Sequence, residues 1–245
     1  MKKSLALGSL LLLVFSLIPA AAQSSSAASI LEKMIEAGGG RKALEAITDT
    51  TSSGEMEMIA MTMNGTMTMY HKEPGMTRQD MEIMGRTMTQ AYDGEVAWIT
   101  NPQAQTAQEA PSEMHEYSKR GALEMGNSLL LDPEKYGVTH TLKGKENLEG
   151  SDYYRLERVF PGGTTTVLFI DPQTYFVYKQ VQKSLNMMGS EVEQDIYFSD
   201  YKEVDGIMFA HTMTIHQGGE IFAIITITDV KFNSGLDDSF FKMEK

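Results

Sequence analysis

The segment EMEMIAMTMNGTMTMY, from Glu55 to Tyr70, alternates methionine with polar residues around an Asn-Gly pair. Alternation with a period of two predicts a strand with one apolar face, and Asn-Gly favours a tight hairpin turn. Six of these sixteen residues are methionine, although Val and Ile have the higher strand propensity. The segment therefore predicts a hairpin in which either a soft metal ligand or an adaptable apolar side chain is needed.

The register of this hairpin follows from the pairing that gathers its apolar residues on one face. A two-residue turn at Asn-Gly would place methionines on both faces. A three-residue loop over residues 63–65, with a left-handed glycine and a bulge, instead pairs Met61 with Met67 and Ile59 with Met69. We predict this second register, which leaves the earlier methionines, Met56 and Met58, on the opposite face unless another bulge rotates them.

Two further hairpins also place their apolar residues on one face and their polar residues on the other, if they have two-residue turns at Met84-Gly85 and at Gly218-Gly219. The facing pairs predicted for them are Ile83 with Arg86, Met81 with Met88, Thr77 with Tyr92, Ile215 with Phe222 and Met213 with Ile224. Over the three hairpins, the predicted apolar face consists of Ile59, Met61, Met67, Met69, Met81, Ile83, Met88, Tyr92, Met213, Phe222 and Ile224.

Helical periodicity is confined to two places. A capping box of Ser29 with Glu32 predicts a first helix that ends at the glycines 38–40, followed by a short piece over residues 41–47. A second helix is predicted over residues 112–127, inserted between strands. The apolar residues of the two helices are Ile30, Leu31, Met34, Ile35, Met114, Tyr117 and Leu123. Because alternation continues almost everywhere else from Thr50 onward, the sequence predicts a mainly β protein with an antiparallel sheet or barrel.

The N-terminal region has the layout of a cleavable export signal. Lys2 and Lys3 precede an apolar run over residues 5–18, and Pro19 and three alanines follow it. Fourteen residues are too few to span a bilayer, which needs about 20. The sequence therefore predicts a signal peptide over residues 1–22, cleaved after Ala22, and a protein exported to the periplasm that is not membrane-spanning after cleavage.

Composition narrows the class of protein further. The chain has no cysteine, which excludes disulfides and a lipid-attachment cysteine. Without the two lysines of the signal, 19 basic residues face 33 acidic ones, a net charge of −14. This excess argues against nucleic acid, because binding to phosphates needs Lys and Arg. No linker divides residues 29–245, so we predict one domain there.

The concentration of methionine supports two functional interpretations. Ten of the 19 methionines lie between residues 56 and 88, which general core filling does not predict. Thioethers select Cu(I), and the Met-x-Met pairs 61/63 and 67/69 would place both sulfurs of a pair on one face of a strand. Flexible methionines also suit apolar surfaces that adapt to varied ligands. A Met-lined wall for lipid acyl chains is the interpretation we favour, since the histidines are scattered and no metal or cofactor is required.

Enzyme motifs are weak in this sequence. We find no G-x-S-x-G, no H-E-x-x-H and no phosphate-binding loop. The sequence Ser199-Asp200-Tyr201-Lys202 matches S-x-x-K but lacks the motifs that accompany it in β-lactamases. We therefore predict no catalytic residues and no enzymatic activity.

Several stretches resemble the periplasmic lipoprotein carriers of the LolA-like family, also described as outer membrane lipoprotein-sorting proteins. They are ILEKMIEAGGGRKALEAI (30–47), KEPGMTRQDMEIMG (72–85), AYDGEVAWITNP (91–102), YFSDYKEVDGIMFAH (197–211) and VKFNSGLDDSFF (230–241), which together span most of the chain. The resemblance lies in the order and spacing of turns and strands, and none of the stretches is a catalytic signature.

This resemblance implies an incomplete antiparallel barrel of about eleven strands around a hydrophobic cavity, with the two helical regions as a lid or plug. It implies a non-enzymatic carrier of lipid or lipoprotein acyl chains, with an inner-membrane donor and an outer-membrane acceptor protein as partners. Either Arg78 or Arg86 can correspond to the arginine that locks the lid in such carriers. Because the same fold also serves in envelope sensing, an interaction or sensor module remains an alternative, as does a Cu(I)-binding protein.

Overall fold

The computed structural model describes residues 26–100, 106–185 and 189–243. The predicted signal peptide, residues 1–22, lies outside the described residues. No helix in the described part of the chain is long and apolar enough to cross a membrane.

One antiparallel sheet dominates the fold, in the spatial order β6-β5-β4-β3-β2-β1-β13-β12-β11-β10-β9-β8-β7. Thirteen strands form it within the described residues, where the resemblance implied about eleven, and the sheet is open because its two end strands do not pair. The strands are β1 Asp49–Met58, β2 Met63–Lys72, β3 Met76–Ile83, β4 Arg86–Tyr92, β5 Ala97–Thr100, β6 Ala107–Glu109, β7 Thr139–Leu148, β8 Ser151–Val159, β9 Thr165–Ile170, β10 Val177–Leu185, β11 Glu191–Val204, β12 Ile207–Gln217 and β13 Glu220–Phe232.

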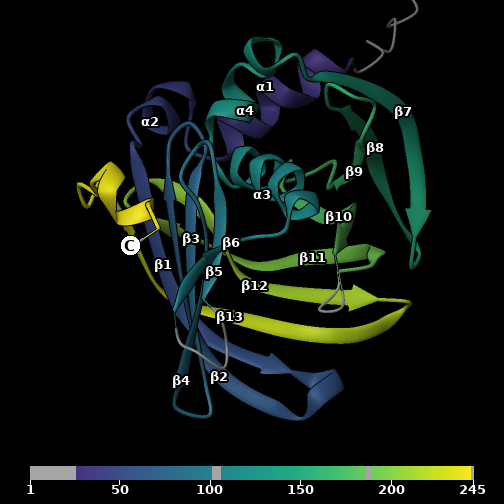
Figure 1. Ribbon diagram of the computed structural model, residues 1–245. Coiled ribbons are helices and arrows are strands. Elements are labelled where there is room, and N and C mark those ends of the chain that lie inside the picture. The colour runs from purple at the N-terminus through teal and green to yellow at the C-terminus, as the bar shows by residue number, and fades with distance from the viewer. Residues whose placement is uncertain (1–25, 101–105, 186–188, 244–245) are drawn as a thin grey trace, which may run out of the picture.

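The helices lie inside the curve of this sheet, toward one end of the strands (Figure 1). They are α1 Ala27–Ala37, α2 Arg41–Glu45, α3 Ser112–Met125 and α4 Ser128–Leu131, with short 3-10 helices η1 Ile59–Met61, η2 Pro133–Tyr136 and η3 Asp238–Phe241. We call the side of the sheet that faces the helices its inner face. The predicted α+β class, mainly β with helices inserted between strands, is confirmed.

The hairpin of β1 and β2 differs from the predicted one. Its turn is made by η1 and by Thr62, which is left-handed at φ 53°, and Met58 pairs with Met63. The predicted loop over residues 63–65 is therefore wrong. Gly65 lies inside β2, where the carbonyl of Glu82 on β3 approaches it so closely that a Cβ atom would clash. The Asn-Gly pair thus serves a close approach between strands rather than a turn.

The predicted register of β3 and β4 is confirmed, whereas that of β12 and β13 is wrong by one residue. Ile83 pairs with Arg86 and Met81 with Met88, as expected for a turn at residues 84–85. At the other hairpin Gln217 and Glu220 flank the glycine turn, but a bulge follows between residues 215 and 216. The bulge shifts the pairing, so that Ile215 pairs with Ala223, not Phe222, and Met213 pairs with Ile225, not Ile224.

Helix α1 begins three residues before the start that the predicted capping box implies, and it ends as predicted. Ser26 is its N-cap: Ser29 N donates to Ser26 Oγ at 3.1 Å, and Ser26 N donates to Ser29 Oγ at 3.0 Å. The predicted capping box of Ser29 with Glu32 is therefore wrong, because a serine three residues after the cap fills the role assigned to the acid. The helix ends before the glycines at 38–40, and α2 follows directly.

Candidate functional site

A cluster of strand side chains forms an apolar wall on the inner face of the sheet. We call it the methionine wall; its buried members are Met56, Met67, Met69, Ile225, Ile227 and Val230. Partly buried side chains complete it: Met58, Met81, Ile83, Val204, Phe209, Met213, Ile215 and Phe232. Within the described residues, none of these members comes from a helix. The wall therefore belongs to the sheet alone, at the strands β1–β3 and β11–β13.

Five predicted wall residues lie in the methionine wall, namely Met67, Met69, Met81, Ile83 and Met213. Met88 lies beside it, because it pairs with Met81 across β3 and β4. Four others do not belong to it. Ile59 and Met61 lie in the turn η1, where Ile59 is 46% exposed. Ile224 lies on the outer face, because its neighbours Ala223 and Ile225 point inward, and Phe222 is the unpaired residue of the bulge between Ile221 and Ala223.

The remaining predicted residue, Tyr92, is buried against Ala97, Ala110 and Ala122, beneath α3 rather than in the wall. The sequence left Met56 on the opposite face unless a further bulge rotated it, and the turn η1 at residues 59–61 does bring it into the wall. Sequence reasoning missed Ile225 and Ile227 as wall residues. The turn η1 sets the register that brings Met56 to the inner face, and two bulges in β13, at Thr228 and at Phe222, decide the positions of Ile225 and Ile227. Period-two alternation alone could not locate either bulge.

The helices pack against the sheet on either side of the methionine wall. On α1, Ile30, Leu31 and Met34 join Leu156 and Leu168 of β8 and β9, and Ile35 packs with α2. On α3, the three residues predicted to belong to a lid make contacts in three different places. Met114 packs near Tyr92, Leu123 packs toward α4, and Tyr117 Oη donates to Glu191 Oε2 at 2.7 Å. The helices thus pack mainly on strands that flank the methionine wall, and the cluster around α1 and α2 meets the wall at Phe232.

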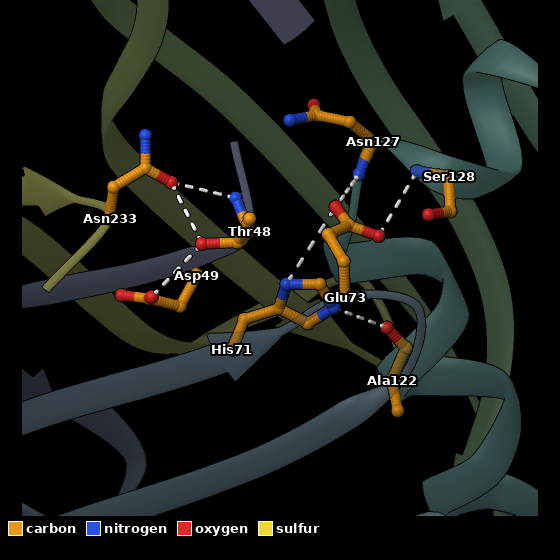
Figure 2. Close-up of polar contacts among 8 residues, drawn as sticks. All are labelled: Thr48, Asp49, His71, Glu73, Ala122, Asn127, Ser128 and Asn233. Carbon is orange, nitrogen blue, oxygen red and sulfur yellow. Dashed lines mark hydrogen bonds and ion pairs between the residues drawn. The ribbon is translucent and has the colours of Figure 1, made fainter. Parts of the chain in front are cut away.

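Two residues of the β2–β3 turn region attach α3 and α4 to the sheet (Figure 2). His71 Nε2 lies 3.1 Å from the carbonyl oxygen of Ala122 on α3. The Glu73 carboxylate accepts from the backbone N–H of Asn127 at 2.6 Å and from that of Ser128 at 3.2 Å. Burial lowers the pKa of His71, although the nearby Glu73 carboxylate opposes this effect. The imidazole is thus disfavoured as a cation where the helices meet the sheet.

A second polar contact joins α3 to the opposite part of the inner face. Arg158 Nε on β8 donates to His140 Nε2 on β7 at 3.1 Å, and Arg158 Nη1 lies 3.3 Å from Glu124 Oε1 on α3. The side chains of Arg158 and Glu124 are 8% and 6% exposed. Burial and the charge of Arg158 lower the pKa of His140 to about 4. This arrangement fixes α3 through a buried ion pair next to a neutral histidine.

Neither arginine considered for locking a lid contacts a lid helix. Arg78 Nη1 donates to the carbonyl of Phe240, and its guanidinium lies 4.5 Å from the centre of the Phe240 ring, next to Trp98. Arg86 is exposed at the start of β4. The arginine that does contact α3 from the sheet is Arg158, on a strand that the sequence did not single out.

Depressions occur at two hairpin tips, and Met56 of the methionine wall lines the larger one. The larger, of about 480 Å³, is lined by residues from β1 to β4, among them Glu55, Glu57, Glu82 and Met84. A smaller one, of about 370 Å³, lies beside the turn at Gly218. The described residues contain no group of three or more His, Cys, Asp or Glu side chains that could hold a metal ion.

Comparison with solved structures identifies the fold. A DUF1329 family protein from Desulfovibrio piger has a TM-score of 0.58 and 17% identity, over 88% of this chain and 97% of that one. A LolA superfamily protein from Nitrosomonas europaea has a TM-score of 0.56 and 16% identity, over 89% and 98%. A domain from Vibrio parahaemolyticus, assigned to outer membrane lipoprotein sorting, has a TM-score of 0.54 and 19% identity, over 86% and 97%.

These similarities reside in structure rather than in sequence. No protein-family model matches the chain, and no curated protein matches it. In each of these comparisons the similarity extends over 97–98% of the solved chain, so it concerns the whole fold. The chain has a LolA-like fold.

Proposed function

We propose that this protein is a non-enzymatic carrier of lipid or lipoprotein acyl chains, and that the methionine wall is the surface that holds them. The observation that carries this proposal is an apolar cluster on the concave side of the sheet to which no helix in the described residues contributes. The similarity to a LolA superfamily protein and to a lipoprotein-sorting domain supports the same class of function.

The chemistry of the wall suits a ligand of variable shape. Met58, Met81 and Met213 are only partly buried, so their thioether side chains are available for contact. Unbranched methionines repack around different ligands more easily than β-branched residues do. Each methylene buried on such a surface contributes about 0.8 kcal/mol, so a chain of roughly 15 carbons would gain about 12 kcal/mol before entropic costs. Acyl binding of this kind needs no charged group.

The proposed setting is the periplasm, with the carrier moving between membrane-associated partners. The lysine-led apolar segment at residues 2–22 supports export, and the excess of acidic residues argues against nucleic acid as a partner. An inner-membrane donor and an outer-membrane acceptor protein are the partners proposed for such a carrier, and residues 29–245 are proposed to act as one domain.

Native mass spectrometry of the protein purified from its own host tests this proposal. We expect copurified lipid, or uptake of an added fatty acid by the delipidated protein. Met81→Gln and Met213→Gln, which place amides on the wall, should each weaken fatty-acid binding by about tenfold or more, as expected for one lost apolar contact. Ile224→Gln is the control, because the side chain of Ile224 points away from the wall, on the outer face of the sheet. An empty protein that takes up no fatty acid would refute the proposal.

Copper(I) binding is a second candidate, favoured by one feature of the register. Met67, Met81 and Met88 pair in a row across β2, β3 and β4, so three thioethers share the inner face. Thioethers are soft ligands that select Cu(I). This candidate predicts Cu(I) affinity that falls when Met67, Met81 and Met88 are all replaced by leucine, whereas acyl binding should persist because leucine keeps the wall apolar. Unchanged Cu(I) affinity in that variant would show that these methionines are not Cu(I) ligands.

A further inference from the structure

Methionine is the only form of sulfur in this chain. The sequence has 19 methionines and no cysteine, so no thiol of the protein competes for an oxidant. Ten of these methionines lie between residues 56 and 88, on the strands β1–β4 and the turns between them. Oxidation to the sulfoxide is reversible and changes the apolar methionine side chain into a polar one. An oxidant can therefore change the polarity of a surface that is built from methionine.

The methionine wall contains thioethers at two levels of exposure. Three of its methionines are between 5% and 8% exposed, namely Met56, Met67 and Met69. Three others are only partly buried, and we call them the accessible wall methionines: Met58, Met81 and Met213. Oxidation of a side-chain sulfur follows its exposure. We therefore expect the accessible wall methionines to react in the folded protein and the three buried methionines to be protected.

The neighbours of the accessible wall methionines are apolar. Met81 faces Met67 on β2 and Met88 on β4, and Met213 faces Ile225 on β13. The backbone N–H groups of paired strands donate to each other in the ladder, so they do not serve a side-chain oxygen. A sulfoxide oxygen at these positions is hydrated while the wall is open to water. When a ligand covers the wall, the same oxygen loses its water without gaining a donor, which is unfavourable.

We propose that Met58, Met81 and Met213 are sites of reversible oxidation, and that their sulfoxides weaken acyl binding at the methionine wall. This inference rests on the proposed carrier function and adds a means of regulation to the same surface. Leucine would keep the wall apolar but has no sulfur to oxidise, so the modification gives a second reason for methionine at these positions. The proposed periplasmic setting is an oxidising one.

A peroxide supplies the oxygen in this modification. The methionine sulfur donates an electron pair to one oxygen of hydrogen peroxide, an S–O bond forms and the O–O bond breaks. The proton on the transferred oxygen moves to the leaving hydroxide, which becomes water. The sulfur is thus oxidised by two electrons and the peroxide is reduced by two, so the step needs no catalytic group from the protein.

Peptide mapping by mass spectrometry identifies the oxidised residues. The folded, delipidated protein is treated with hydrogen peroxide, with a chelator present so that bound copper takes no part. Each accessible wall methionine should gain one oxygen, whereas the three buried methionines should gain oxygen only after unfolding in urea. Met84, which is 85% exposed, shows whether the treatment was sufficient. The inference is overturned if Met84 is fully oxidised while the accessible wall methionines stay unmodified.

Fatty-acid binding before and after oxidation measures the consequence. The dissociation constant of the wild type should rise by about tenfold or more, as expected for polar groups left without partners under the ligand. Methionine sulfoxide reductases, with dithiothreitol as reductant, should restore the original affinity. The triple variant with Met58→Leu, Met81→Leu and Met213→Leu should bind fatty acid and should lose much less affinity after peroxide, because these substitutions nearly conserve volume.

The double variant Met84→Leu and Met125→Leu is the matched control. It removes two exposed thioethers, at 85% and 41% exposure, that do not belong to the methionine wall. After peroxide it should lose as much fatty-acid affinity as the wild type does. The inference is overturned if the triple variant loses affinity as fully as the wild type, or if the double variant is protected.

The untreated wild type separates this inference from the proposed function. If it binds no fatty acid, the carrier function fails, and the regulation fails with it even where sulfoxides form on the wall. If it binds fatty acid, and the oxidised protein with sulfoxides at all three sites binds equally well, only the regulation fails.

Discussion

His140 and His71 lie at two of the places where side chains couple the helices to the inner face of the sheet. Both are disfavoured as cations, His140 by burial and by the charge of Arg158, and His71 by burial. His140 is the more informative of the two because its Nε2 accepts a hydrogen bond from Arg158, which itself pairs with Glu124 of α3. Protonating this ring would set two cations against each other at the base of α3.

The lowered pKa of His140 predicts acid sensitivity between about pH 6.5 and 4. Its pKa is about 4 in the folded protein and 6.5 ordinarily, so across this window the unfolded chain binds a proton that the folded chain does not. The free energy of unfolding should therefore decrease as the pH falls from 6.5 to 4. Urea denaturation at several pH values measures this, and in His140→Asn, which keeps an acceptor for Arg158, the decrease should be smaller. Equal decreases in both proteins would contradict the prediction.

Among the elements, α3 and α4 are the pair whose position depends most on contacts with distant strands. The link between them passes over the β2–β3 region at Gly126, where a Cβ atom would clash with His71 and would lie 2.8 Å from either oxygen of Glu73. The backbone of Gly126 is extended, at φ −90° and ψ 171°, so any residue could adopt it. The glycine is therefore required by space rather than by conformation.

Gly126→Ala should destabilise the protein by about 1–3 kcal/mol, the usual effect of overpacking a tight site. Gly121→Ala provides a matched control on α3, because no atom lies within 4 Å of its added methyl group. That substitution should stabilise the protein by roughly 0.5–1 kcal/mol, since alanine favours helix over glycine. Chemical denaturation of the two variants measures both effects. Similar changes in both variants would show that the Gly126 link is not tightly packed.

Across the whole molecule, the C-terminal segment closes the outer face of the sheet over strands from the first half of the chain. Trp98 Nε1 donates to the carbonyl of Phe241 at 2.7 Å, and Arg78 Nη1 donates to that of Phe240. Earlier in the same C-terminal segment, the backbone N–H groups of Ser234 and Gly235 donate to the Asp49 carboxylate at the start of β1. Asn233 contacts Thr48 at the same place (Figure 2). These contacts bring together segments nearly two hundred residues apart.

Truncation before Asp237 should expose Trp98, which is the only tryptophan in the chain and is 4% exposed. Its fluorescence emission should shift to longer wavelength, and stability should fall by about 3–5 kcal/mol, as for loss of a buried phenylalanine. Lys242→Ala, at an exposed neighbouring residue, should leave the emission unchanged. An unshifted spectrum in the truncated protein would show that the segment does not shield Trp98.

Sequence by itself determined the features that depend on neighbouring residues. Period-two alternation and turn residues predicted the antiparallel sheet and the register of β3 with β4, and the glycines at 38–40 predicted the end of α1. Five wall residues followed from the same local reasoning, among them Met67 and Met81.

Tertiary structure alone decided the positions where one strand adapts to another. Gly65 lies within β2, where the Glu82 carbonyl leaves no space for a Cβ atom, and a bulge at Phe222 of β13 turned Ile225 inward in place of Ile224. The pairing of Arg158 with Glu124 on α3 was likewise beyond local reasoning, because the two residues meet only when the sheet curves around the helix. Local pattern sets which segments form strands, whereas backbone contacts between distant segments set the bulges and hence which side chains face the wall.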